Sequence, residues 1–101
     1  MDRRQAFHEL LCGILGTDHV YFQPPESVQM TYPCIVYVRS SIRTRHAANL
    51  PYSLHKQYTV TVIDKDPDSA IPDRIAALPL CSFDRHYTAD NLNHDVFQLY
   101  Y

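Results

Sequence analysis

The most regular pattern of hydrophobic and polar positions lies at residues 58–64, Tyr-Thr-Val-Thr-Val-Ile-Asp. β-Branched and aromatic residues dominate this stretch, which contains neither glycine nor proline, as is typical of a β-strand. Valine, isoleucine and tyrosine fall on both faces, and threonine is the only polar side chain before Asp64. The pattern therefore predicts a central strand, covered by a helix on one face and partly by another segment on the other.

Other stretches show the same two-residue period or continuous apolar runs. Residues 34–38 predict a strand covered on both faces, and 20–22 predict a short edge strand or an extended link. Residues 80–88 and 94–101 alternate, and Asn and Asp between them favour a turn. Together they predict a β-hairpin with a loop of roughly five residues.

Residues 2–15 predict an amphipathic helix. Its apolar positions share one helical face with the spacing i, i+3, i+4, i+7 and i+8, namely Phe7, Leu10, Leu11, Ile14 and Leu15. Asp2 can cap the first turn, and Gly16 is a natural C-terminal stop. His8 falls outside the apolar face, so we expect a surface histidine.

A second, short helix is predicted after the acidic turn at 64–69. Ser69 can cap it, and Pro72 fits the first turn, where the amides have no intrahelical partner. Its buried stripe is Ile71, Ile75 and Leu78, and Pro79 ends it. We expect about nine residues, which is less than three helical turns.

These elements predict a fold of the α+β class in one domain spanning residues 1–101. A mainly antiparallel sheet of about four strands carries the N-terminal helix and the short second helix, and it ends in the β-hairpin. The chain is long enough to bury about two thirds of its unfolded surface without metals or disulfides.

Net charge, cysteine spacing and the length of apolar runs limit the classes of function and partner that we expect. The net charge is −2, from 9 basic and 11 acidic residues, which gives no overall basic footprint and argues against sequence-directed binding to duplex DNA. Cys12, Cys34 and Cys81 form no CxxC pair, so we interpret them as small buried hydrophobes in a reducing cytosol. No apolar run approaches the roughly 18 residues of a membrane span, so no membrane partner is expected.

The apolar run at 34–38 continues into a polar and basic stretch at 39–46. Arg39, Arg43 and Arg45 occupy alternate positions, which would place them on one side of an extended strand. Three interpretations remain open: a solvated face, an arm that forms salt bridges with another subunit, or a nucleic-acid contact. The last is disfavoured because no aromatic side chain interleaves the arginines.

Two clusters could bind a metal. Asp64, Asp66 and Asp68 have the spacing that opens an EF-hand loop, but Ser69 and Ile75 replace the glycine and glutamate that the loop requires. Helix capping and turn formation account for these aspartates without a metal.

The second cluster lies at the predicted hairpin tip. His86, Asp90, His94 and Asp95 offer zinc-type ligands, but their spacing across a loop fixes no geometry. Local Asx turns and cross-strand hydrogen bonds are the preferred interpretation. The sequence also lacks GxSxG, HExxH and a glycine-rich phosphate loop, so we expect a protein that is not an enzyme and has no cofactor.

Several strings between Tyr32 and the C-terminus form a recognisable set. They are Tyr-Pro-Cys-Ile-Val-Tyr at 32–37, Leu-Pro-Tyr at 50–52, Tyr-Thr-Val-Thr-Val-Ile-Asp-Lys-Asp-Pro-Asp-Ser at 58–69, Ile-Pro-Asp at 71–73 and Cys-Ser-Phe-Asp-Arg-His-Tyr-Thr-Ala-Asp-Asn-Leu-Asn-His-Asp-Val-Phe at 81–97. This set resembles the small tail-completion proteins of long-tailed phages and prophages, described as tail terminators or head–tail joining proteins. The resemblance implies a structural protein of the virion neck, assembled in the host cytoplasm.

The resemblance also implies the partners. Copies of the chain would form a ring of about six subunits that caps the tail tube protein and docks to the head-side connector or stopper protein. Genomic DNA would pass through the ring without sequence recognition. The residues predicted to form subunit or partner interfaces are Arg39, Arg43, Arg45, His46 and Tyr52.

Two other functions remain open at this stage. One is a metal-dependent hydrolase that uses His86, Asp90, His94 and Asp95. The other is a monomeric adaptor that binds a peptide along an exposed sheet edge.

Overall fold

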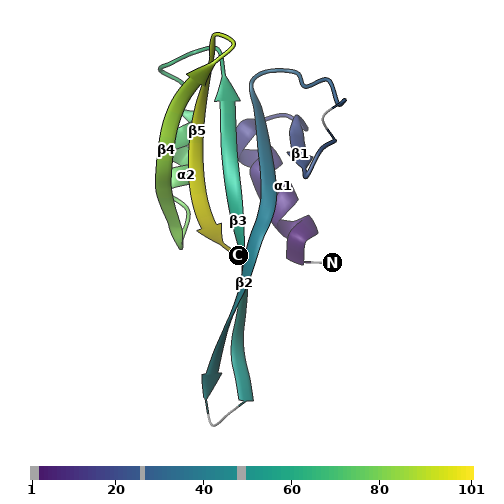
Figure 1. The fold of residues 1–101 in the computed structure, drawn as a ribbon, viewed down its shortest axis with the longest axis vertical. Helices are drawn as coiled ribbons and strands as arrows, with labels where there is room; N and C mark the ends of the chain where they lie inside the picture. The colour runs from purple at the N-terminus through teal and green to yellow at the C-terminus, as the bar shows by residue number, and fades with distance from the viewer. Residues whose placement is uncertain (1–2, 26, 48–49) are drawn as a thin grey trace.

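The computed structural model describes residues 3–25, 27–47 and 50–101, with side chains described outside residues 41–55. Two helices pack on one twisted sheet (Figure 1). In chain order, the elements are α1 (Arg3–Leu15), β1 (Val20–Phe22), β2 (Cys34–Ala47), β3 (Leu50–Asp64), α2 (Ile71–Ala76), β4 (Cys81–Ala89) and β5 (Leu92–Tyr100). The strand order is β1-β2-β3-β5-β4, and only the β1–β2 pair is parallel.

The main core lies between the two helices and one face of the sheet. Tyr37 of β2, Val60 of β3 and Phe97 of β5 are successive register partners, so their side chains share this face. Phe7 of α1 and Ile75 of α2 cover it and are fully buried. The helical spacing in α1 and the alternation in the strands thus meet in one core, which confirms the predicted α+β class.

A smaller cluster covers part of the opposite face. Cys34, Ile63 and Leu92 are buried there, and the connection after β1 packs Met30 and Tyr32 against them. This arrangement confirms the prediction that the central strand is covered by a helix on one face and partly by another segment on the other.

The strand count differs from the predicted four because residues 20–22 form a true strand, β1, which pairs in parallel with β2. The second helix has six residues and not nine, and it begins after Ala70, which makes no side-chain capping bond. Ser69 contributes in a different way: its Oγ accepts a hydrogen bond from the Ile71 N–H at 3.3 Å. Pro72 lies in the first turn, as predicted.

The β4–β5 loop has two residues and not the five that the sequence predicted. Asp90 and Asn91 have φ values of +53° and +62°, as required at both central positions of a type I′ turn. Asp and Asn tolerate this left-handed conformation better than other side chains, which allows the strands to extend to Ala89 and Leu92. The polar composition of 89–93 signalled a turn but not its length.

Replacement of Asn91 by glycine is expected to stabilise the protein by about 0.5–1 kcal/mol, because glycine adopts a positive φ without steric cost. Asn93→Gly is the matched control, and we expect it to destabilise the protein. Asn93 lies within β5, and its Nδ2 donates to the carbonyl oxygens of Asp64 and Lys65. Urea denaturation of both variants measures the free energies of unfolding, and a destabilised Asn91→Gly variant would contradict the turn assignment.

An aromatic network joins α1 to the sheet. Phe7 contacts Tyr37, Tyr58 and Tyr101, with ring centroids 4.8–5.4 Å apart. Tyr37 and Tyr58 are themselves buried. At least two of the eight tyrosines of the chain therefore belong to the core.

His8 is half-buried against this network and is not the surface histidine that the sequence predicted. Its Nδ1 lies 2.8 Å from the Tyr37 hydroxyl, and Arg4 donates to the same oxygen at 3.3 Å. Since Arg4 can only donate, the hydroxyl hydrogen is available to the neutral imidazole. Burial, followed by the Arg4 charge, lowers the pKa of His8 below its ordinary value of 6.5.

This lowered pKa predicts how His8 affects stability. The unfolded chain binds a proton at His8 more readily than the folded protein, so His8 destabilises the fold as the pH falls below about 6.5. A His8→Gln variant retains an acceptor for Tyr37 and does not titrate. We expect urea midpoints of the wild type to fall more than those of the variant between pH 7.5 and pH 5, and parallel profiles would contradict the assignment.

Candidate functional site

The β2–β3 hairpin projects far beyond the body of the protein. β1 ends at Phe22, opposite Tyr37, and β5 ends at Tyr100, opposite Gln57. Beyond these points, apart from the backbone pairing of Lys56 with Tyr101, the described parts of β2 and β3 pair only with each other, as far as Ala47 and Leu50. We call residues 39–56 the arm, and it gives the molecule its longest dimension, 51 Å against 24 and 23 Å (Figure 1).

The base of the arm is fixed to the body on both sides. The backbone N–H of Arg39 donates to the Gln23 Oε1 at 3.3 Å, and Lys56 and Tyr101 exchange two backbone hydrogen bonds of 3.0 and 3.3 Å. The rest of the arm is a two-stranded ribbon, and such a ribbon is at best marginally stable in water by itself. A projecting ribbon is therefore expected to pack against a partner.

The arm is strongly basic, although the whole chain is slightly acidic. Residues 39–56 include four of the nine basic residues and none of the eleven acidic ones. The remainder of the chain carries five basic and eleven acidic residues. The molecule is thus electrostatically polar, with a positive extension on a negative body.

The predicted interface residues all belong to this hairpin. Arg39 is exposed at the base of the arm. The register shifts between Arg39 and Ser41, which interrupts the simple alternation of backbone positions along this part of β2. The backbones of the other four predicted residues lie in β2 and β3 of the ribbon, and their side chains are not among those that the structure describes. These residues are Arg43, Arg45, His46 and Tyr52.

A free sheet edge lies on the far flank of the body. β4 is an outermost strand, paired with β5 on one side, and nearly all of its residues are exposed. Phe83 and Tyr87 remain 58% and 42% exposed, although Phe83 packs edge-on against Phe97 and Tyr87 stacks on His94. An edge strand with exposed aromatic side chains is a site at which another strand can add.

The four candidate metal ligands at the hairpin, for which the sequence favoured turns and cross-strand hydrogen bonds, are not brought together by the sheet. His86 pairs with Asp95, with 2.8 Å between Nδ1 and Oδ1. His94, next to Asp95, stacks on Tyr87, and adjacent residues of a strand point to opposite faces. Within the described part of the chain, no group of three or more His, Cys, Asp or Glu residues is arranged to hold a metal ion.

The aspartates after β3 fold the turn that leads to α2. An Asp64 Oδ1 accepts from the Asp66 N–H at 3.0 Å, and an Asp66 Oδ1 accepts from the Asp68 N–H at 2.9 Å. These are successive Asx turns, in agreement with the preferred interpretation of this motif.

The three cysteines are free thiols with raised pKa values. Burial, followed by the charge of Asp64, raises the pKa of Cys34 to about 11. Burial also raises the pKa values of Cys12 and Cys81. All three are therefore protonated near neutral pH, which makes them poor nucleophiles.

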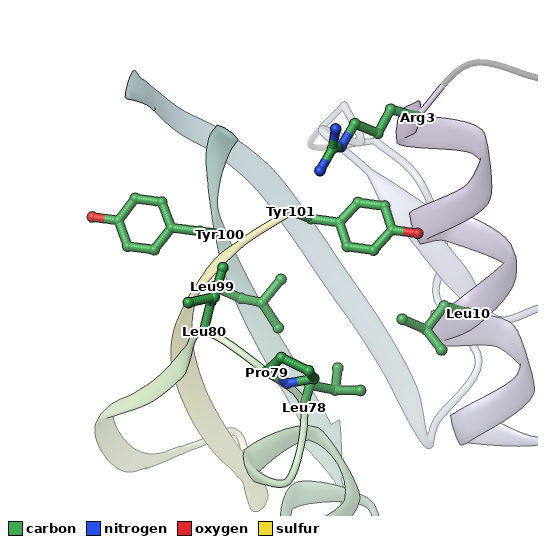
Figure 2. A pocket seen from close by; sticks show the side chains of 8 residues that line it. All are labelled: Arg3, Leu10, Leu78, Pro79, Leu80, Leu99, Tyr100 and Tyr101. Carbon is green, nitrogen blue, oxygen red and sulfur yellow. The ribbon is translucent and has the colours of Figure 1, made fainter. Parts of the chain in front are cut away.

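A shallow apolar pocket of about 180 Å³ lies where α1, the turn after α2 and the end of β5 meet (Figure 2). Its rim includes Leu10 and Leu80, and Tyr101 forms part of its wall beneath the Arg3 guanidinium. Leu80 is 60% exposed with a φ of +60°, which is uncommon for a bulky residue. Sequence reasoning missed this feature because Leu80 fits the alternation of the following strand.

The pocket is smaller than most sites for small molecules, which occupy about 300–1,000 Å³. Neither helix of the described chain has the length and apolar character needed to cross a membrane.

No protein-family model matches the chain, and no curated protein shows significant similarity to it. Among the described residues, the arm and the outer edge of β4 are exposed features that can contact a partner.

Proposed function

We propose that this chain is a structural protein of a phage virion and forms a homo-oligomeric ring at the head–tail junction. The ring caps the tail tube and docks to the head-side connector, and its subunits carry out no catalysis. The observation that carries the proposal is the basic arm, which extends beyond a compact body and has no flanking strand among the described residues. The strings at 58–69 and 81–97 support the same role through their resemblance to tail-completion proteins.

The physical requirements of a ring subunit agree with this proposal. A closed ring needs a rigid body and two unlike surfaces that meet head to tail between successive copies. Here the body is a packed sheet with two helices, and the arm and the β4 edge are two unlike surfaces. An excess of negative charge on the body, outside the arm, also suits a channel through which DNA must slide without binding.

Negative-stain imaging of the purified protein, alone and on isolated tail tubes, tests the proposal. We expect closed rings of about six copies, seated on the end of the tube. Tails assembled without the protein should lack a defined end. A strictly monomeric protein under assembly conditions, together with tails of normal length in its absence, would overturn the proposal.

The exposed edge of β4 also favours a second candidate, a monomeric adaptor that binds an extended peptide by strand addition. The two functions differ in stoichiometry. A ring subunit self-associates through surfaces of its own chain, whereas an adaptor remains a monomer and binds a peptide saturably. Sedimentation velocity across a range of concentrations separates these outcomes.

A further inference from the structure

We propose that the arm of one copy adds as an extra pair of strands to the outer edge of β4 in the next copy. This inference rests on the proposed ring and specifies the contact that builds it. It joins two surfaces that each copy carries once, so each subunit gives its arm to one neighbour and receives an arm from the other.

The backbone of β4 is suited to accept a strand. Ala89 and Leu92 flank the two-residue turn and form the first hydrogen-bonded pair of the hairpin. Hydrogen-bonded and non-hydrogen-bonded pairs alternate along an antiparallel ladder. The next pair, Thr88 and Asn93, is therefore a non-hydrogen-bonded pair. The Thr88 N–H is therefore directed to the outer edge, where a strand from another copy can pair with it.

The arm is suited to supply the strand. Both of its strands have an outer edge that no other strand of the described chain covers. The stretch of β2 from Arg39 to Ala47 has the same number of residues as β4 from Cys81 to Ala89. The arm points away from its own body (Figure 1), so it can meet a β4 edge only in another copy.

Complementary charge favours the surface formed by residues 64–95, which we call the β4 flank, as the partner of the arm. Residues 64–95, which include the acidic turn, α2 and β4, carry seven acidic and three basic residues. This net charge of −4 matches the net charge of +4 on residues 39–56. On β4 itself, Asp84 is exposed and accepts a hydrogen bond from the Gln98 side chain, whereas Arg85 lies over the Tyr87 ring. Complementary charge of this kind steers association and fixes which surfaces meet.

Strand addition would also cover the exposed aromatic rings on β4. Phe83 and Tyr87 retain large exposed fractions in the single chain, although each already contacts an aromatic ring of β5. Aromatic residues are enriched at protein interfaces. A nucleic acid is the less suitable partner for the arm, because DNA would not cover β4 and would be repelled by its acidic flank.

A proline at position 88 tests the contact. Thr88→Pro removes the outward N–H and leaves the inward ladder of β4 intact, whereas Thr88→Ala keeps the N–H and is the matched control. We expect the proline variant to form rings at least tenfold less readily than the wild type, as measured by mass photometry and negative stain. The alanine variant should assemble normally, and circular dichroism should show that both are folded.

A second variant tests the arm independently of β4. In the Arg43→Glu, Arg45→Glu chain, the arm carries charges of the same sign as the β4 flank, so we expect no rings. A mixture of this chain with Thr88→Pro has one intact arm and one intact β4 edge per pair. The mixture should therefore give a 1:1 dimer and nothing larger, although neither chain associates alone.

The outcomes separate the contact from the ring itself. Wild-type rings together with equally stable Thr88→Pro rings would overturn the arm–β4 contact and leave the ring intact. A monomeric wild type on tail tubes would overturn both. Normal rings from the Arg43→Glu, Arg45→Glu chain, with loss of binding to duplex DNA, would assign the arm to nucleic acid and overturn the contact.

Discussion

Phe7→Ala is expected to destabilise the protein by about 3–5 kcal/mol, a large part of the stability of a small domain. Phe7 is fully buried and is the centre of the aromatic network that joins α1 to the sheet. Its ring contacts Tyr37 and Tyr58 of the central strands and Tyr101 at the C-terminus. Truncation leaves a cavity bounded by rigid rings, which can only partly collapse.

The matched control is Leu10→Ala, on the same helix but 37% exposed. It removes apolar atoms without opening an enclosed cavity, and we expect it to cost about 1 kcal/mol or less. Urea denaturation followed by circular dichroism measures both free energies of unfolding. Equal losses in the two variants would show that α1 is not held to the sheet through Phe7.

Local periodicity in the sequence predicted the elements that form the core. The helical spacing from Phe7 to Leu15 and the alternation at 58–64 each specify a buried face without reference to the rest of the chain. Gly16 ends α1 with a φ of +86°, which a C-terminal glycine stop requires. The fold class follows, since amphipathic helices and alternating strands have few ways to cover each other.

Features that depend on long-range pairing could not be predicted in the same way. The parallel pairing of β1 with β2 and the strand order have no local signal. The extension of β3 back to Leu50 depends on its pairing with β2, because residues 50–57 lack a strand-like period of their own. Pairing between distant segments determines these features, and it leaves little trace in composition.

In the candidate site, too, the sequence predicted the features with a local signal and missed those set by strand pairing. The sequence identified the basic stretch at 39–46, but the register shift after Arg39 interrupts the alternation on which the grouping of its arginines relied. It also grouped His86 and His94, although adjacent register positions send Asp95, the partner of His86, and His94 to opposite faces. Residue types reveal which chemistry is available, whereas register decides which side chains meet.

We expect that most of the arm can be deleted without unfolding the body of the protein. Ile42 and Lys56 are register partners near the base of the arm, so residues 43–55 can be replaced by Asn-Gly, the preferred two-residue hairpin turn. The excised part pairs only with itself among the described residues, and the main core lies elsewhere. We therefore expect the shortened chain to fold with a melting temperature within a few degrees of the wild type.

Assembly of the shortened chain should fail, because the ring is proposed to depend on the arm. We expect at least a tenfold loss of rings by negative stain, and tails completed with the shortened chain should lack a defined end. Asn91→Gly is the control, since it changes a hairpin turn of the body and leaves both the arm and the acidic residues near β4 intact. A shortened chain that remains folded and still closes rings on tail tubes would show that the arm serves another purpose, whereas one that unfolds would show that the ribbon supports the sheet from which it projects.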